Sequence, residues 1–120
     1  MKIITETEKA NRLLNSYDGG VLKVAFYDES LKRIAIRITM ANVKELVYII
    51  GIGCERMNGY FNFSNTSILI EQFFDEEMHE YLTRVSDRSS RFELITTGGV
   101  TVVHGLESEF GKSFEAFIYE

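Results

Sequence analysis

The sequence predicts an α+β fold: a mostly antiparallel curved sheet, or a half-open barrel, of about six to seven strands with two short helices packed on it. Apolar and polar residues alternate with a period of two along several segments, as they do in half-buried strands. Turn-forming Gly, Asn and Asp residues separate these segments, and only two stretches space apolar residues as helices do. No linker divides the 120 residues, so we expect a single domain that spans 1–120.

The first half of the chain is predicted to contain one helix and three strands. Thr5 and Glu8 form a capping-box pattern, so a short helix is expected to follow. Alternating residues over 21–27 and 33–40 predict a hairpin. The segment 46–52 is apolar on both faces and rich in β-branched residues, which favours a central strand.

The second half is predicted to contain a strand over 66–73, a helix capped by Asp75, a hairpin of 91–96 with 100–104, and a last strand over 113–119. The helix is inferred from apolar residues spaced three and four apart. These residues are Met78, Tyr81, Leu82 and Val85.

The chain is acidic, with 18 Asp and Glu residues against 13 Lys and Arg residues and a net charge of -5. Phosphate binding requires clustered cations, and the sequence has no basic run, so a nucleic-acid partner is not expected. An acidic surface suits a basic protein partner, because complementary charges accelerate the encounter.

Cysteine content and hydropathy favour the cytoplasm. Cys54 is the only cysteine, which excludes an internal disulfide. The first 15 residues lack the apolar core of a signal peptide, and no segment approaches the ~20 apolar residues of a membrane span. We therefore expect a cytoplasmic protein without a membrane partner.

Glycines at the end of the predicted central strand bear a partial likeness to a nucleotide-binding motif. Gly51 and Gly53 follow an apolar strand, as in the dinucleotide fingerprint, but Arg56 replaces the third glycine and no helix follows. Their expected role is a bulge or a close approach of the backbone.

Acidic residues and a histidine share one face of the predicted second helix. A metal cage would need a second carboxylate–histidine helix, which the sequence lacks, and acidic residues in a first turn favour the helix dipole. We predict no metal site and no cofactor. The residues concerned are Asp75, Glu76, His79 and Glu80.

No catalytic residue is predicted. Nucleophilic catalysis would require a Ser, Thr or Cys beside an orienting base, but His79 and His104 lie far from Cys54 in sequence, and Cys54 is expected to be a buried, inert thiol at the central strand. Neither a nucleophile elbow nor a phosphate loop is present. Tyr60, Phe61 and Phe63 concentrate three aromatic rings past a turn, where they serve either as interface anchors or as core.

Several segments resemble small bacterial immunity proteins of polymorphic and contact-dependent toxin systems. The resemblance rests on 17–24 (YDGGVLKV), the strand 34–38, the segment 42–46 and the segment 92–95. In that group an Asp-Gly or His-Asp element opens the first strand; here Tyr17 stands where a histidine often precedes the aspartate.

The resemblance implies a cytosolic, non-enzymatic protein that binds and neutralises a cognate toxin, such as a basic nuclease. The densest acidic patch is expected to face the toxin, with an aromatic anchor beside it. The expected partner-binding residues are Glu71, Asp75, Glu76, Glu77 and Glu80, with Tyr60 or Phe61 as the anchor.

Two alternatives remain. A small ligand-binding or enzymatic domain would enclose a pocket within the aromatic-lined sheet. A phage or accessory protein would instead assemble through exposed strand edges. The sequence does not predict the oligomeric state.

Overall fold

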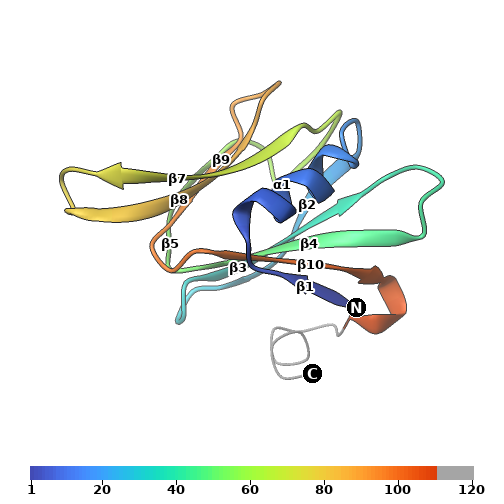
Figure 1. Cartoon of the computed structure of the whole chain (residues 1–120), viewed down its shortest axis with the longest axis horizontal. Coiled ribbons are helices and arrows are strands. Elements are labelled where there is room, and N and C mark those ends of the chain that lie inside the picture. Colours follow the sequence, from blue (N-terminus) through green and yellow to red (C-terminus); the bar gives the residue numbers. More distant parts are fainter. Residues whose placement is uncertain (111–120) are drawn as a thin grey trace.

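Ten strands, one α-helix and one 3-10 helix make up residues 1–110, the part of the chain that the computed structural model describes (Figure 1). The predicted last strand at 113–119 lies outside these residues. The elements in chain order are β1 (Lys2–Ile4), α1 (Thr7–Asn15), β2 (Val21–Asp28), β3 (Arg33–Thr39), β4 (Glu45–Ile52), β5 (Cys54–Asn58), β6 (Asn62–Ser64), β7 (Ile68–Asp75), β8 (Glu80–Asp87), β9 (Glu93–Thr96), β10 (Val100–Leu106) and the 3-10 helix (Glu107–Glu109).

The strands form two antiparallel sheets that lie one over the other. The first sheet has the strand order β1-β10-β4-β3-β2-β6, and the second has the order β5-β9-β8-β7. The prevalence of antiparallel sheet together with a helix confirms the α+β class in its coarse form. The strands nevertheless divide into two sheets, which do not close into a barrel, and the expected number of strands was too low.

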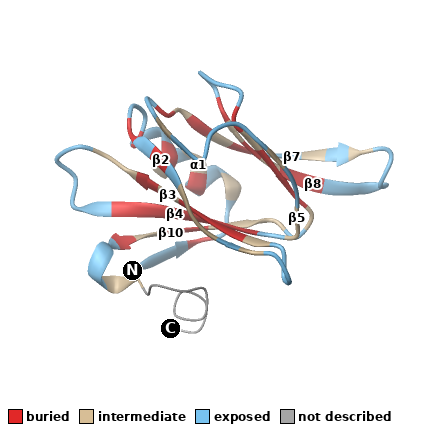
Figure 2. Ribbon diagram, turned by 180° about the vertical axis from the view of Figure 1, so that it is seen from behind, coloured by how far each residue is buried: buried red, intermediate tan, exposed pale blue. Residues whose placement is uncertain are grey.

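Alternating side chains from both sheets fill the space between them, and the buried positions lie along the middle of the strands (Figure 2). The prediction of a central strand over 46–52 is confirmed. Val47 and Ile49 of β4 join the core between the sheets, whereas Leu46, Tyr48 and Ile50 form a second cluster on the opposite face. Burial on both faces explains why this strand is apolar throughout.

The predicted hairpin of 91–96 with 100–104 is wrong. β9 pairs with β5 and β8 in the four-stranded sheet, whereas β10 pairs with β4 and β1 in the six-stranded sheet. The turn between them therefore carries the chain from one sheet to the other. It runs beside the crossing from β4 to β5, since the amide of Thr97 donates to Gly53 O and that of Gly98 to Ile52 O, each at 2.9 Å.

Glycine is required at this crossing because the two backbones approach closely. Gly53 has φ +69, and a Cβ there would lie 2.3 Å from Thr97 Oγ1. At Gly51 an added Cβ would lie 3.1 Å from Thr96 Cγ2 and 3.2 Å from Ile34 Cγ2. The interpretation as a close backbone approach is thus confirmed for Gly53, whose added Cβ would also lie 3.1 Å from Gly98 N, whereas the close neighbours of Gly51 are side chains.

The predicted second helix is also wrong, because residues 68–87 form the β7–β8 hairpin. Asp75 caps a turn instead: its Oδ1 accepts hydrogen bonds from the amides of Glu77 (2.9 Å) and Met78 (3.2 Å). The left-handed backbone of His79 (φ +54) then reverses the chain. β-branched residues such as Val85 favour the strand that follows, which lies between two others.

The predicted first helix is confirmed as α1, although its capping box is not formed: Glu6 occupies the N-cap and no side chain caps it. α1 lies along β7, the edge strand of the smaller sheet. The side chain of Asn11 extends the sheet at this edge, since its Nδ2 donates to Ile70 O and its Oδ1 accepts from Ile70 N, both at 2.8 Å.

Replacing Asn11 by alanine should destabilise the fold, because it leaves the partly buried N–H and C=O of Ile70 without their amide partner. We expect the free energy of unfolding to fall by about 1–3 kcal/mol, measured by urea denaturation. Asn15→Ala, at the exposed end of the same helix, is the matched control. Equal losses in the two variants would contradict a structural role for the Asn11 amide.

Candidate functional site

The β7–β8 hairpin projects beyond the sheet to which it belongs (Figure 1). The last pair between β8 and β9 joins Thr83 to Thr96, whereas the pairing of β7 with β8 continues to Asp75 and Glu80. Residues 74–81, which we call the hairpin tip, therefore form a two-stranded ribbon ending in a four-residue turn.

Three large apolar side chains are exposed at the hairpin tip. Phe74 and Tyr81 pair directly across the two strands, and their rings contact edge to face with centroids 5.3 Å apart. Phe74 is 48% exposed, Met78 47% and Tyr81 71%. Two rings that contact each other edge to face and are still exposed to solvent offer a preformed apolar surface. From the sequence, Met78 and Tyr81 are predicted to lie on the apolar face of a helix, and Phe74 is not identified as a site residue.

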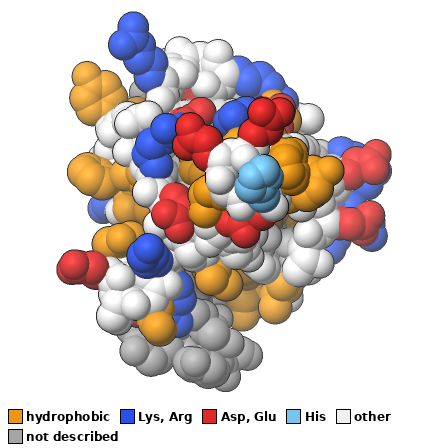
Figure 3. Space-filling model, turned by 90° about the vertical axis from the view of Figure 1, so that its left-hand side faces the viewer, with side chains coloured by type: hydrophobic (Ala, Val, Ile, Leu, Met, Phe, Trp, Pro, Cys, Tyr) orange, Lys and Arg blue, Asp and Glu red, His pale blue; other side chains and the backbone are white. Residues whose placement is uncertain are grey.

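Three further residues of the hairpin tip carry exposed negative charge. Glu76, Glu77 and Glu80 are exposed, and within residues 1–110 none of them has an ion pair or a side-chain hydrogen bond. Asp75 differs, because its carboxylate holds the turn. Figure 3, which views this end of the molecule, shows hydrophobic and acidic side chains near the histidine, with Lys and Arg side chains among them. The tip therefore combines exposed apolar side chains with three carboxylates that form no ion pair within residues 1–110.

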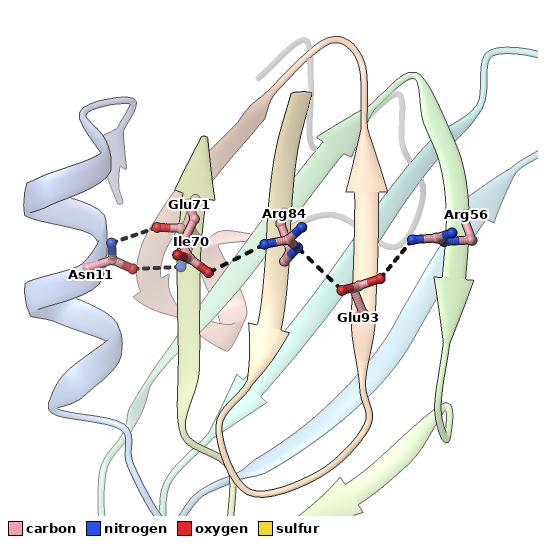
Figure 4. A network of polar contacts seen from close by, with 6 residues as sticks. All are labelled: Asn11, Arg56, Ile70, Glu71, Arg84 and Glu93. Carbon is pink, nitrogen blue, oxygen red and sulfur yellow. Dashed lines mark hydrogen bonds and ion pairs between the residues drawn. The ribbon is translucent and has the colours of Figure 1, made fainter. Parts of the chain in front are cut away.

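Glu71 belongs to a different feature, a row of alternating charges across the outer face of the four-stranded sheet (Figure 4). Arg84 lies 3.9 Å from Glu71 and 3.3 Å from Glu93, and Arg56 lies 3.0 Å from Glu93. The Arg84 guanidinium also covers the ring of Phe73 at 4.3 Å. Arg84 on the neighbouring strand offsets the charge of Glu71, so Glu71 does not add to the unpaired negative charge of the hairpin tip.

Tyr60 and Phe61, the expected anchors, are exposed (80% and 66%) but lie elsewhere. They follow β5, at the opposite edge of the sheet from β7. Asn58 at the end of β5 pairs with Glu93 of β9, which in turn pairs with Ser86 of β8. From Ser86, the turn of the hairpin lies roughly 20 Å further along β8. The structure therefore brings together Asp75, Glu76, Glu77 and Glu80 but not the two predicted aromatic residues.

Phe61 instead lines an open groove of about 520 Å³ between the facing edges of the two sheets. Most of its lining is apolar, with Val24, Tyr27 and Ile34 from the larger sheet and Cys54 and Met57 from β5. Burial, and to a smaller extent the nearby negative charge of Glu55, raise the pKa of the Cys54 thiol to about 11. A thiol with this pKa is a poor nucleophile at neutral pH.

The two histidines lie on different sheets. His79 occupies the hairpin turn, whereas His104 on β10 contacts Tyr17, with Nε2 3.1 Å from the phenol oxygen. The helical face that would have aligned Asp75, Glu76, His79 and Glu80 does not exist. Residues 1–110 contain no group of three or more His, Cys, Asp or Glu side chains placed to hold a metal ion.

Among residues 1–110, no helix is long and apolar enough to cross a membrane.

Comparisons with protein-family models, with curated proteins and with solved structures find no match to this chain. Functional inference therefore rests on the geometry of its own surfaces.

Burial in the groove should slow the alkylation of the Cys54 thiol, and this rate can be measured. At about pH 8 a thiol with a pKa of about 11 is roughly a hundredfold less ionised than one with the usual value of 9.0. We expect iodoacetamide to alkylate Cys54 in the native protein roughly a hundredfold more slowly than in the urea-unfolded chain. Similar rates in the two states would show that the groove leaves the thiol open and unperturbed.

Proposed function

We propose that this chain is a cytoplasmic immunity protein, which binds a cognate bacterial toxin and neutralises it through the hairpin tip. The observation that supports this proposal best is that one projecting ribbon carries both the exposed Phe74–Tyr81 ring pair and the exposed carboxylates of Glu76, Glu77 and Glu80. The toxin itself is inferred from the resemblance of 17–24 and of the strand that follows to immunity proteins.

The apolar centre and the charged rim of the tip have different roles in such a complex. Aromatic side chains that become fully desolvated supply much of the affinity of protein interfaces. Carboxylates at the rim mainly raise the association rate with a basic partner and lower the affinity for acidic competitors. A nuclease surface that binds phosphates is basic, so it complements the tip.

The shape of the tip also suits inhibition. A two-stranded ribbon that extends past its sheet can enter a concave site, whereas a flat sheet face cannot. The turn is preorganised by the hydrogen bonds of Asp75, which lowers the entropy lost when the ribbon binds. We therefore propose that the tip enters or covers a basic cleft of the toxin.

Reversing two charges of the tip tests the proposal. The binding probe is the toxin domain that the proposal requires, to be sought as the C-terminal domain of a large secreted protein encoded next to this chain's gene. We expect Glu76→Lys/Glu77→Lys to slow association at low salt by at least about tenfold, because like charges then meet across the interface. Association rates measured by surface plasmon resonance, and protection of cells that express the toxin domain, are the two readouts.

The matched control is Glu29→Lys/Glu107→Lys, which makes the same change in net charge at exposed residues outside the tip. It should retain the wild-type association rate and protect cells. If both double variants behave alike, the hairpin tip is not the binding surface. A neighbouring domain that is harmless to cells without this chain would contradict the immunity function itself.

A second candidate function is the binding of a small apolar molecule in the groove. Its volume of about 520 Å³ lies in the range of ligand sites, and Tyr27 and Phe61 give it aromatic walls. A bound ligand would shield Cys54 from alkylation, whereas a toxin on the hairpin tip would leave the alkylation rate unchanged.

A further inference from the structure

A basic cavity lies between β1, α1 and β10 of this acidic protein. Its volume is about 410 Å³, and its lining consists of Lys2, Ile4, Lys9, Arg12, Leu13 and His104. Every polar side chain in this lining is a cation or can become one, and no carboxylate belongs to it. The chain as a whole has 18 acidic against 13 basic residues, so this local excess of positive charge runs against the composition.

The fold brings these cations together from distant parts of the sequence. Lys2 is the direct partner of His104 in the β1–β10 pair, so both side chains lie on the same face of the sheet. Lys9 and Arg12 stand three residues apart on α1 and share one face of the helix. Three cations from β1 and α1, together with the His104 imidazole from β10, therefore surround one space.

Little in the described residues neutralises these charges. Glu6 forms an ion pair with Lys9 at 3.2 Å, but both side chains are well exposed, and such pairs bind weakly. Neither Lys2 nor Arg12 has an ion pair with any residue of 1–110. Two cations thus remain available for an anionic ligand.

Hydrogen bonds fix the orientation of His104. The phenol oxygen of Tyr17 lies 2.8 Å from the carbonyl oxygen of Glu45 and 3.1 Å from His104 Nε2. Since a carbonyl can only accept, the phenol donates to Glu45 and accepts from Nε2–H. The imidazole Nε2 then carries a proton, and this contact sets the orientation of the ring. Burial, and then the charge of Glu45, raise the pKa of Tyr17, which keeps the phenol protonated.

We propose that this cavity binds the phosphoryl group of a small phosphate ester. Arg12 supplies the planar donor fork that suits phosphate oxygens, and Lys2 and Lys9 supply point charges. The cavity is several times larger than a phosphate ion, and Ile4 and Leu13 give it apolar walls against which the organic part of the ester packs. This site shares no residue with the hairpin tip, so it stands independently of the proposed toxin binding.

The test uses the full chain, inorganic phosphate and phenyl phosphate, followed by amide chemical shifts in NMR spectra. We expect saturable shifts confined to α1, β1 and β10, and phenyl phosphate should bind about tenfold more tightly than phosphate because its ring is buried. Equal affinities for the two probes would overturn the assignment to an ester. Shifts that do not saturate, or that scatter over the surface, would overturn the site.

Arg12→Gln and Lys44→Gln form a matched pair, because each removes one exposed positive charge and only Arg12 lines the cavity. We expect Arg12→Gln to weaken phenyl phosphate binding about tenfold, while Lys44→Gln changes it by less than about twofold. Similar affinities in the two variants would mean that the protein attracts anions without a specific site. Thermal unfolding of both variants checks that the fold is intact.

Discussion

The crossing of the chain between the two sheets is the constraint on which the rest of the structure depends. Backbone hydrogen bonds join 52–53 to 97–99, so β4 and β10 stay paired in one sheet while β5 and β9 pair in the other. β9 has to end at Thr96, because the chain leaves the smaller sheet there. β8 continues past this point without a neighbour on that side, and the hairpin tip projects as a result. The exposed ribbon is thus a consequence of the topology, and its exposed aromatic residues then have no sheet to cover them.

The two open sides of the sandwich differ in what covers them. On one side α1 covers the edge of β7, and the Asn11 amide satisfies the backbone of Ile70 as another strand would. The same helix contributes Lys9 and Arg12 to the basic cavity. On the other side no helix of residues 1–110 covers the edge, and these residues leave the apolar groove beside Cys54 open. One sandwich therefore presents three chemically distinct surfaces: an acidic aromatic ribbon, an apolar groove and a cationic cavity.

Local patterns in the sequence were sufficient for the elements whose contacts are local. The helix α1 and the β2–β3 hairpin were predicted because their periodicity and turn residues lie within the segment itself. Residues 78–85 were misassigned because a spacing of three and four fits both a helix face and a strand whose two faces are partly apolar. Which strand pairs with β9 depends on distant backbone contacts at Gly53, which alternation cannot reveal. The acidic patch was predicted from the density of acidic residues, and pairing with Arg84 separates Glu71 from the rest of it. Phe74 was missed because only the projecting hairpin exposes it.

The central claim is that the hairpin tip is the surface on which the protein binds its toxin. Amide hydrogen exchange, followed by mass spectrometry with and without the cognate toxin domain that the proposal requires, tests it most directly, because exchange slows where an interface excludes water. The account predicts that added protection is concentrated in residues 74–81 and is small along the groove and α1. Protection centred on Tyr27 and Phe61, with the tip exchanging as in the free protein, would contradict it.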